Sequence, residues 1–199
     1  EDLLQKAGLQ KDALFPHYQC EKCGDTGYID GRMCTCLKGL LRQEAYRRLN
    51  SMTPLTLSGF EQFDLRYYSD HPASDGISPR MHMEDVLHFC RNYADTFSAH
   101  SASLLFQGRT GLGKTHLSLS IARQAIDRGY GVVYGSVQNF VSALEKERFG
   151  RSNEDTNGML LHCDLLILDD LGTEFSTTFV SSALYNIINT RLMAEKPTI

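Results

Sequence analysis

A glycine-rich segment of eight residues constrains the fold of this 199-residue chain more than any other feature. The segment reads Gly108-Arg109-Thr110-Gly111-Leu112-Gly113-Lys114-Thr115 and matches the pattern G-x-x-x-x-G-K-[ST] at every fixed position. A short apolar run precedes it and a helical pattern begins inside it. Glycines let successive backbone N–H groups turn inward around a phosphate, and the helix N-terminus adds partial positive charge. The segment therefore predicts a strand–loop–helix unit that binds nucleotide phosphates, and a glycine turn that matches by chance is the alternative.

The residue types in this loop predict individual roles. Lys114 is expected to reach the β- and γ-phosphates and to act in catalysis, and the Thr115 hydroxyl is expected to hold Mg²⁺. The residues expected to contact ATP, directly or through the metal, are Gly108, Arg109, Thr110, Gly111, Leu112, Gly113, Lys114, Thr115, His116 and Asp169.

A second motif supports a nucleotide site. The apolar run Leu165-Leu166-Ile167-Leu168 ends in two carboxylates, Asp169 and Asp170, which is the Walker B pattern. At the carboxyl end of a parallel strand, Asp169 would face the same crevice as the phosphate loop and hold Mg²⁺ through its water shell. Asp170 is placed to orient or deprotonate the attacking water, with Glu174 as the competing candidate for that base. The alternative is that Asp170 merely caps the next turn.

The pattern from residue 81 onward alternates helices with strands, which predicts an α/β fold with a parallel sheet and crossover helices. Helices are expected at 83–97, 114–128, 137–148 and 178–194, and strands at 103–106, 131–135 and 165–168, with Ile199 opening a fourth strand.

Four of the six cysteines lie close together near the N-terminus, in the pattern Cys20-x-x-Cys23 and Cys34-x-Cys36. Asp30-Gly31 between the pairs is a strong hairpin turn, which would bring the pairs together. Four thiolates suit tetrahedral Zn²⁺, and so short a segment has too little core to fold without one. His17 could replace one thiolate. A redox C-x-x-C and disulfides are the alternatives, whereas Cys90 and Cys163 read as small buried apolar residues.

Composition excludes several broad classes. The chain is 42% hydrophobic and 22% charged with a net charge of −4, so it is neither disordered nor basic overall, and any nucleic-acid contact must be local. No apolar run of membrane-spanning length and no leader are present, so we expect a cytoplasmic protein without a membrane partner. Both ends look cut, which suggests a fragment of a longer protein.

The expected organisation is a cysteine segment and helix at 1–50, a linker at 51–80 and a C-terminally truncated ATPase core at 81–199. Phe60, Phe63, Tyr67 and Tyr68 in the linker are expected to pack on the core, with an adenine cover as the alternative. The basic face of the helix at 37–50 reads as solvated, with a contact to nucleic acid or an acidic partner as the alternative. Phe149-Gly150-Arg151 reads as a loop anchor, with a contact to single-stranded DNA as the alternative.

Taken together, these residues resemble a known family. The segments 108–115 and 165–174, with Ile187-Ile188-Asn189-Thr190-Arg191, resemble AAA+ ATPases of the bacterial helicase-loader type (DnaC/DnaI), to which the IstB-type transposition helper ATPases are closely related. The segment Cys20 to Tyr28 also resembles the cysteine segment that precedes the ATPase core in many DnaI-like proteins. The resemblance implies a P-loop NTPase of the AAA+ kind preceded by a small zinc-binding segment.

The resemblance also implies a function. Such proteins bind ATP with Mg²⁺, associate with the hexameric replicative helicase in the primosome, help place it on single-stranded DNA, and self-associate through the ATP site. Asp170 stands where many AAA+ proteins have glutamate, so hydrolysis is expected to be weak or partner-dependent. A transposition helper, and a nucleotide-binding switch or scaffold with negligible turnover, remain as alternatives.

Overall fold

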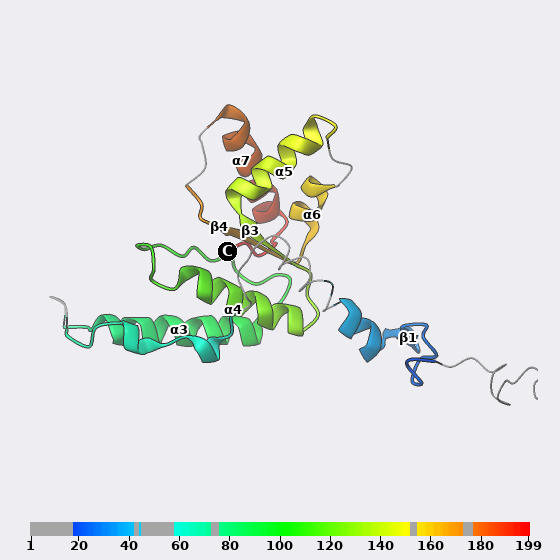
Figure 1. The fold of residues 1–199 in the computed structure, drawn as a ribbon, viewed down its shortest axis with the longest axis horizontal. Coiled ribbons are helices and arrows are strands. Elements are labelled where there is room, and N and C mark those ends of the chain that lie inside the picture. Colours follow the sequence, from blue (N-terminus) through cyan, green and yellow to red (C-terminus); the bar gives the residue numbers. More distant parts are fainter. Residues whose placement is uncertain (1–17, 42–43, 45–57, 73–75, 152–154, 173–176) are drawn as a thin grey trace, which may run out of the picture. The chain divides into compact units, whose positions relative to one another are not determined.

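The fold is taken from a computed structural model that describes residues 18–41, 44, 58–72, 76–151, 155–172 and 177–199 (Figure 1). The chain forms two compact units, Glu1–Leu41 and Arg42–Ile199. The boundary expected at residue 50, His17 and most of the basic helix at 37–50 lie outside the described residues. Within the described part, no helix is both long and apolar enough to cross a membrane.

The first unit contains a small antiparallel hairpin. Strand β1 (Tyr28–Ile29) pairs with β2 (Arg32–Met33), and Tyr28 lies opposite Met33. The two residues between the strands, Asp30 and Gly31, have φ angles of +49° and +74°. Positive φ at both positions is the geometry of the tight turn that Asp-Gly favours, so the predicted hairpin is confirmed. A helix follows from residue 35 and is described as far as residue 41.

The second unit is built around a parallel sheet. Strand β3 (Val132–Ser136) pairs in parallel with β4 (Leu165–Asp169), and Ser136 lies opposite Asp169. On the other side of β4, Thr198 forms a parallel bridge with Leu166. The N–H of Leu104 donates in turn to the carbonyl of Thr198 at 3.0 Å. The spatial order is therefore β3, β4, the 197–199 segment and the 103–106 segment, and the start of a fourth strand expected at Ile199 lies beside β4.

The apolar run at 103–106 does not form the regular strand that its sequence predicts. Its link to the neighbouring segment is the single backbone hydrogen bond from Leu104 together with a side-chain bond, in which the Thr198 N–H donates to Ser103 Oγ at 3.1 Å. Because the serine hydroxyl takes the N–H that a backbone carbonyl would otherwise accept, the ladder does not continue along this segment.

Five helices of the second unit are described: α3 (Pro79–Thr96), α4 (Lys114–Asp127), α5 (Val137–Arg148), α6 (Thr156–His162) and α7 (Thr178–Met193). The sequence predicts all but α6, and α3 begins earlier than expected because Ser78 caps it and Pro79 fits its first turn. Two short 3₁₀ helices precede them, Phe60–Gln62 and Leu65–Tyr67.

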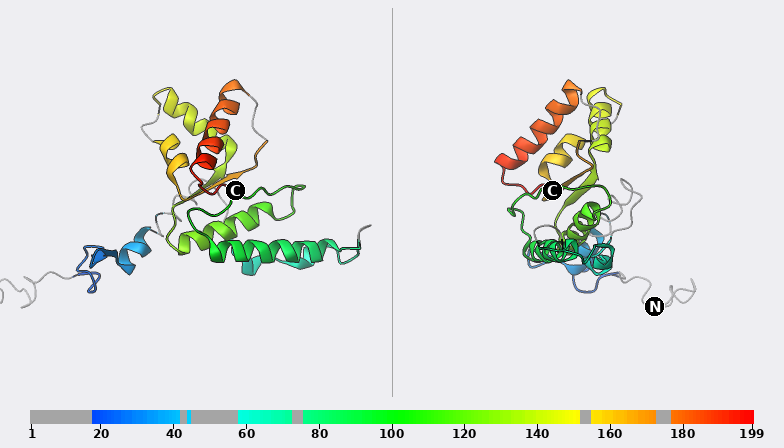
Figure 2. Two further views of the ribbon diagram at one scale, coloured as in Figure 1. Left: turned by 180° about the vertical axis from the view of Figure 1, so that it is seen from behind. Right: turned by 90° about the vertical axis from the view of Figure 1, so that its left-hand side faces the viewer.

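Helices cover both faces of the sheet, as Figure 2 shows with α3 and α4 on one side and α5, α6 and α7 on the other. Alternation along the strands explains the two layers, since successive side chains point to opposite faces. Leu165 and Ile167 pack with α3 and α4, whereas Leu166 and Leu168 pack with α5, α6 and α7. The carboxyl ends of the two strands, Ser136 and Asp169, lie opposite one another between these layers.

Candidate functional site

The phosphate loop ends where α4 begins, at Lys114. Gly111 and Gly113 both have φ of +82°, a conformation that side chains with a Cβ disfavour. Gly113 is also confined by its surroundings, because a Cβ there would lie 2.6 Å from the Phe63 ring. The two glycines thus give the loop the sharp curvature that a phosphate cradle requires.

Lys114 lies across the mouth of this loop. Its Nζ donates to the carbonyl oxygens of Gly108 at 3.0 Å and of Arg109 at 2.9 Å. The side chain therefore folds back over the loop and brings its ammonium group to the loop carbonyls. A phosphate in the loop could take over these hydrogen bonds, since a charged acceptor is stronger than a carbonyl.

Thr115 and Asp169 meet although one lies in the first turn of α4 and the other ends β4. Thr115 Oγ1 donates to Asp169 Oδ2 at 3.0 Å and lies 3.2 Å from Oδ1. A hydroxyl and a carboxylate are oxygen ligands of the kind that Mg²⁺ prefers. The two residues expected to serve Mg²⁺ are thus brought together, and the donor set fits the ion.

Tyr134 on β3 is a member of this site that sequence reasoning missed. Its hydroxyl donates to Asp169 Oδ2 at 2.5 Å, and its side chain is 2% exposed. Burial and the neighbouring Asp169 carboxylate raise the pKa of Tyr134 far above its usual value. The signal was a tyrosine in an otherwise apolar strand, but only the register of β3 against β4 shows what its hydroxyl reaches.

Asp170 comes directly after Asp169 in the sequence. Its φ is +56°, a value that aspartate tolerates better than most residues. Its N–H donates to Asp169 Oδ1 at 3.0 Å, and the residue is exposed. Asp170 therefore adjoins the Thr115–Asp169 pair from the solvent side. Glu174, the competing candidate for the base, lies outside the described residues.

Two cavities adjoin the phosphate loop, and Lys114 lines both. The larger, of about 630 Å³, is also lined by Gly108, Asp169 and Asp170, with apolar walls that include Ile188 and Leu192. The other, of about 480 Å³, lies toward α3 and is lined by residues such as Phe89. The larger cavity is thus the one that both expected acidic residues line together with Lys114 and Gly108.

The linker packs directly on the loop through its aromatic residues. Phe63 meets the His116 ring edge-on at 5.3 Å and stacks on Tyr68 at 5.9 Å, measured between ring centroids. The Tyr68 hydroxyl donates to the Leu112 carbonyl at 3.2 Å, and His116 Nε2 lies 3.0 Å from the Gly59 carbonyl oxygen. The structure thus places His116 against the linker, while Tyr67 is 87% exposed.

The four N-terminal cysteines converge in the first unit. The sulfur atoms of Cys20, Cys23, Cys34 and Cys36 all lie within 4.8 Å of one another, with 3.8 Å between the first and third and 3.4 Å between the second and fourth. Four sulfurs bound to one zinc at roughly 2.3 Å would lie roughly 3.8 Å apart. The cluster therefore fits tetrahedral Zn²⁺, and all four cysteines are free thiols.

The environment of this cluster favours one thiolate from the start. The Cys36 backbone amide lowers the pKa of the Cys34 thiol to about 6, whereas the neighbouring Cys23 thiol raises the pKa of Cys36 to about 12. One thiol of the cluster therefore ionises readily, whereas ionisation of a further thiol is opposed. A bound cation would favour that further ionisation.

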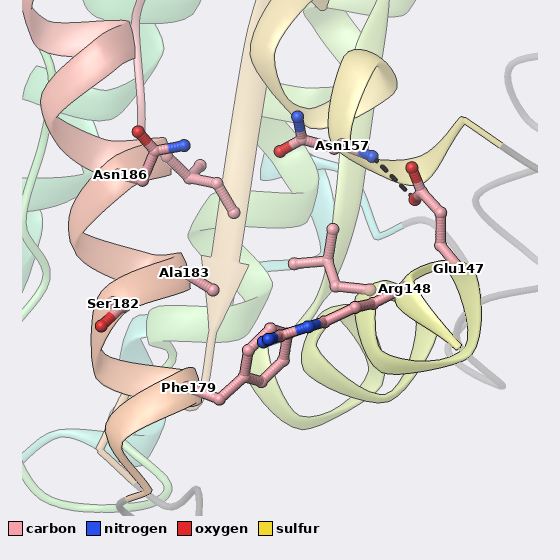
Figure 3. Close-up of a pocket in the computed structure, with 9 residues that line it drawn as sticks. Glu147, Arg148, Asn157, Phe179, Ser182, Ala183 and Asn186 are labelled. Carbon is pink, nitrogen blue, oxygen red and sulfur yellow. Dashed lines mark hydrogen bonds between the residues drawn. The ribbon is translucent and has the colours of Figure 1, made fainter. Parts of the chain in front are cut away.

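A third cavity, of about 510 Å³, lies in the helix layer of α5, α6 and α7 (Figure 3). Arg148 lies over the Phe179 ring at 5.1 Å, and Glu147 accepts hydrogen bonds from the N–H groups of Thr156 and Asn157 at the start of α6. Phe149 and Arg151 beyond α5 contact one another at 5.8 Å. None of these residues contacts the phosphate loop in the described structure.

Comparison of the sequence with known proteins finds a matching family and related proteins. The model of the IstB-like ATP binding protein family matches residues 91–197. The replicative helicase loader DnaC of Escherichia coli (strain K12) is 30% identical over 117 residues, which are 57% of this chain and 47% of that protein, so the chain spans about half the length of the curated relatives it matches.

Two solved structures are similar in fold. The crystal structure of the DnaC helicase loader has a TM-score of 0.55 at 23% identity, over 70% of this chain and 76% of that one. AMPPCP-bound DnaA from Aquifex aeolicus has a TM-score of 0.53 at 25% identity, over 74% of this chain and 42% of that one.

Proposed function

Because the chain belongs to the family of IstB-like ATP-binding proteins, we propose that it binds ATP with Mg²⁺ at the phosphate loop and acts as a replicative helicase loader. The α/β P-loop fold of the AAA+ kind that the sequence predicts is confirmed by the likeness to DnaA and DnaC. The contact between Thr115 and Asp169 is the observation that carries the nucleotide proposal, because it joins the two motifs at one metal-binding point.

In this proposal each residue of the site has a physical task. Lys114 exchanges its bonds to the Gly108 and Arg109 carbonyls for bonds to the β- and γ-phosphates. Thr115 and Asp169 hold Mg²⁺, which when bound neutralises charge on the phosphate oxygens. Backbone N–H groups of the loop and the N-terminus of α4 supply the remaining positive potential.

Hydrolysis is a further step of the proposal. Asp170, beside the metal pair, would orient or deprotonate the attacking water, with Glu174 as the alternative base. Asp170→Asn tests this role, since asparagine also tolerates the positive φ of this position. ATP binding should persist while turnover falls roughly 100-fold or more. If turnover is already negligible in the unaltered protein and partner binding is unchanged, the chain is instead a nucleotide-dependent switch.

The loader assignment rests on the 30% identity with DnaC of E. coli. The partners in this proposal are a hexameric replicative helicase and single-stranded DNA, with copies of the protein associating through the ATP site in the cytoplasm. ATP would fix the conformation that holds helicase and DNA, and hydrolysis would release them.

Light scattering tests the loader proposal directly. The intact protein is mixed with the replicative helicase of the same cell, with and without ATP and Mg²⁺, and the mass of the complex is recorded. Lys114→Ala, which lacks the ammonium over the loop, serves as the variant that cannot bind nucleotide. Arg123→Ala on the same helix, which removes only an exposed ion pair with Glu61, is its matched control. A helicase complex supports the proposal, and its absence in all conditions contradicts it.

A transposition helper is the second candidate, because the family model that matches residues 91–197 is the IstB-like one. Its partner would be a transposase rather than a helicase. The same light-scattering experiment with the transposase encoded beside the gene distinguishes the two, and either outcome leaves the ATP site unchanged.

For the first unit, we propose a structural Zn²⁺ held by Cys20, Cys23, Cys34 and Cys36. The hairpin turn at Asp30-Gly31 brings the two cysteine pairs together, and the sulfur separations support the proposal. The metal would replace the hydrophobic core that so small a unit lacks.

A further inference from the structure

Tyr134 lies outside both nucleotide motifs, yet its hydroxyl reaches the carboxylate at the end of β4. It donates to Asp169 Oδ2, the same oxygen that accepts from Thr115 Oγ1 at 3.0 Å. The two hydroxyls come from different elements, β3 and α4. Asp169 is therefore held from two sides by groups far apart in the sequence.

The register of the sheet explains how Tyr134 reaches this position. Ser136 lies opposite Asp169 and Tyr134 lies opposite Ile167, so Tyr134 and Ser136 share one face of β3. A side chain that leans along its strand can bridge the offset of two residues between Tyr134 and the carboxylate. That face also packs against α4, which carries Thr115.

Packing alone does not account for the hydroxyl. The ring lies in the apolar cluster with Val132, Leu165 and Ile167, which a phenylalanine would fill equally well. A buried hydroxyl is costly unless it is hydrogen-bonded, and the Tyr134 hydroxyl donates to Asp169. The hydroxyl and the carboxylate therefore constrain one another.

We propose that Tyr134 is a positioning residue for Mg²⁺: its hydroxyl fixes the Asp169 carboxylate in the orientation that faces Thr115. A carboxylate that is already oriented loses less freedom when it binds the metal, as partners of metal ligands commonly ensure. This inference rests on the proposed ATP site and extends it to a residue of β3.

Tyr134→Phe tests the inference with binding of a fluorescent ATP analogue, measured in EDTA and across a Mg²⁺ titration. The variant should bind the analogue in EDTA within twofold of the wild-type protein. Its half-saturating Mg²⁺ concentration should rise about tenfold. Tyr93→Phe is the matched control, because it removes another partly buried tyrosine hydroxyl whose acceptor is the Ala102 carbonyl, away from Asp169.

A double variant shows whether the effect passes through the carboxylate. In the Asp169→Asn background, Tyr134→Phe should cause no further change in the Mg²⁺ response, since the interaction it removes is already lost. A further shift of similar size would overturn the inference, because Tyr134 would then act by another route.

The outcomes separate the inference from the proposed function. If Mg²⁺ does not raise the affinity of the wild-type protein for the ATP analogue, both the inference and the proposed function are contradicted. Two results would overturn only the role of Tyr134. In one, Tyr134→Phe leaves the half-saturating Mg²⁺ concentration within twofold of the wild-type value. In the other, Tyr93→Phe changes that concentration as much as Tyr134→Phe does.

Discussion

Thr115 Oγ1 lies 3.0 Å from Asp169 Oδ2, although 54 residues separate the two in the sequence. The contact joins the first turn of α4 to the last residue of β4. It places a hydroxyl and a carboxylate, each expected from its own motif, at a single point beside the phosphate loop.

Thr115→Val should weaken the metal response while keeping the fold, because valine matches threonine in shape but lacks the hydroxyl. We expect nucleotide binding in EDTA to stay within twofold and the gain in affinity from Mg²⁺ to fall roughly tenfold. Fluorescence titration with an ATP analogue measures both. Ser120→Ala is the control, since it removes a buried hydroxyl from the same helix that bonds the His116 carbonyl instead. Equal losses in both variants would point to a general loosening of α4.

Local patterns made much of the site predictable from the sequence. The phosphate loop, the strand that ends in Asp169 and the Asp30-Gly31 hairpin are each encoded within about ten consecutive residues, so spacing alone identifies them. Residues whose role depends on strand register could not be found in this way. Tyr134 is the clearest case, because its contact with Asp169 exists only once β3 and β4 are aligned.

Two further features could not be predicted from the sequence, and each has a physical reason. Helix α6 has seven residues with a glycine inside it, so its intrinsic helix propensity is low, and its stability comes from the Asp155 cap and from packing. The run at 103–106 has the composition of a strand, but Ser103 competes through its side chain for the hydrogen bond that would extend the ladder. Sequence patterns describe propensity, and tertiary partners decide between these outcomes.

The zinc proposal predicts about one Zn per chain in protein purified without chelator, because four ligands make one tetrahedral site. Elemental analysis measures the content. Cys34→Ser should lose the metal and Cys90→Ala, in the core of the other unit, should keep it. Zinc should be released as the pH falls, because protons compete with the metal for the four thiolates. A folded, reduced first unit that lacks metal would contradict the proposal.

Because the Cys90 thiol is buried, we expect the folded protein to lose stability at alkaline pH. Burial raises the pKa of this thiol from 9.0 to about 11, so the folded protein binds its proton more tightly than the unfolded chain does. The stabilisation is complete below pH 9 and is lost as the pH rises toward 11. Between these values the wild-type free energy of unfolding should fall about 2 kcal/mol more than that of Cys90→Ala.

Urea unfolding followed by circular dichroism at pH 8 to 11 gives the difference between the two proteins. The comparison cancels the other titrating groups, which both chains share. Parallel curves for wild type and Cys90→Ala would show that the thiol ionises as freely in the folded state as in the unfolded one.

Arg191 should be the most sensitive basic residue of the second unit, because it is 0% exposed and joins three segments. Its guanidinium donates to the carbonyls of Leu160 and Cys163 at the end of α6, and to that of Pro197 beside β4. Arg191→Met keeps much of the side-chain volume but removes the guanidinium bonds to all three carbonyls; that of Cys163 loses its donor, whereas that of Pro197 keeps the Leu166 N–H. Each buried acceptor without a partner costs about 1–3 kcal/mol, so unfolding in urea should require about 3 kcal/mol less free energy.

Arg191→Lys refines this prediction. Lysine keeps the charge but lacks the planar fork that serves several acceptors at once, so it should recover only a minor part of the loss. Arg66→Ala, which removes an exposed arginine paired with Asp64, should leave the unfolding midpoint unchanged. Full recovery with lysine would mean that the positive charge, and not the fork geometry, stabilises the junction of α6, α7 and the 197–199 segment.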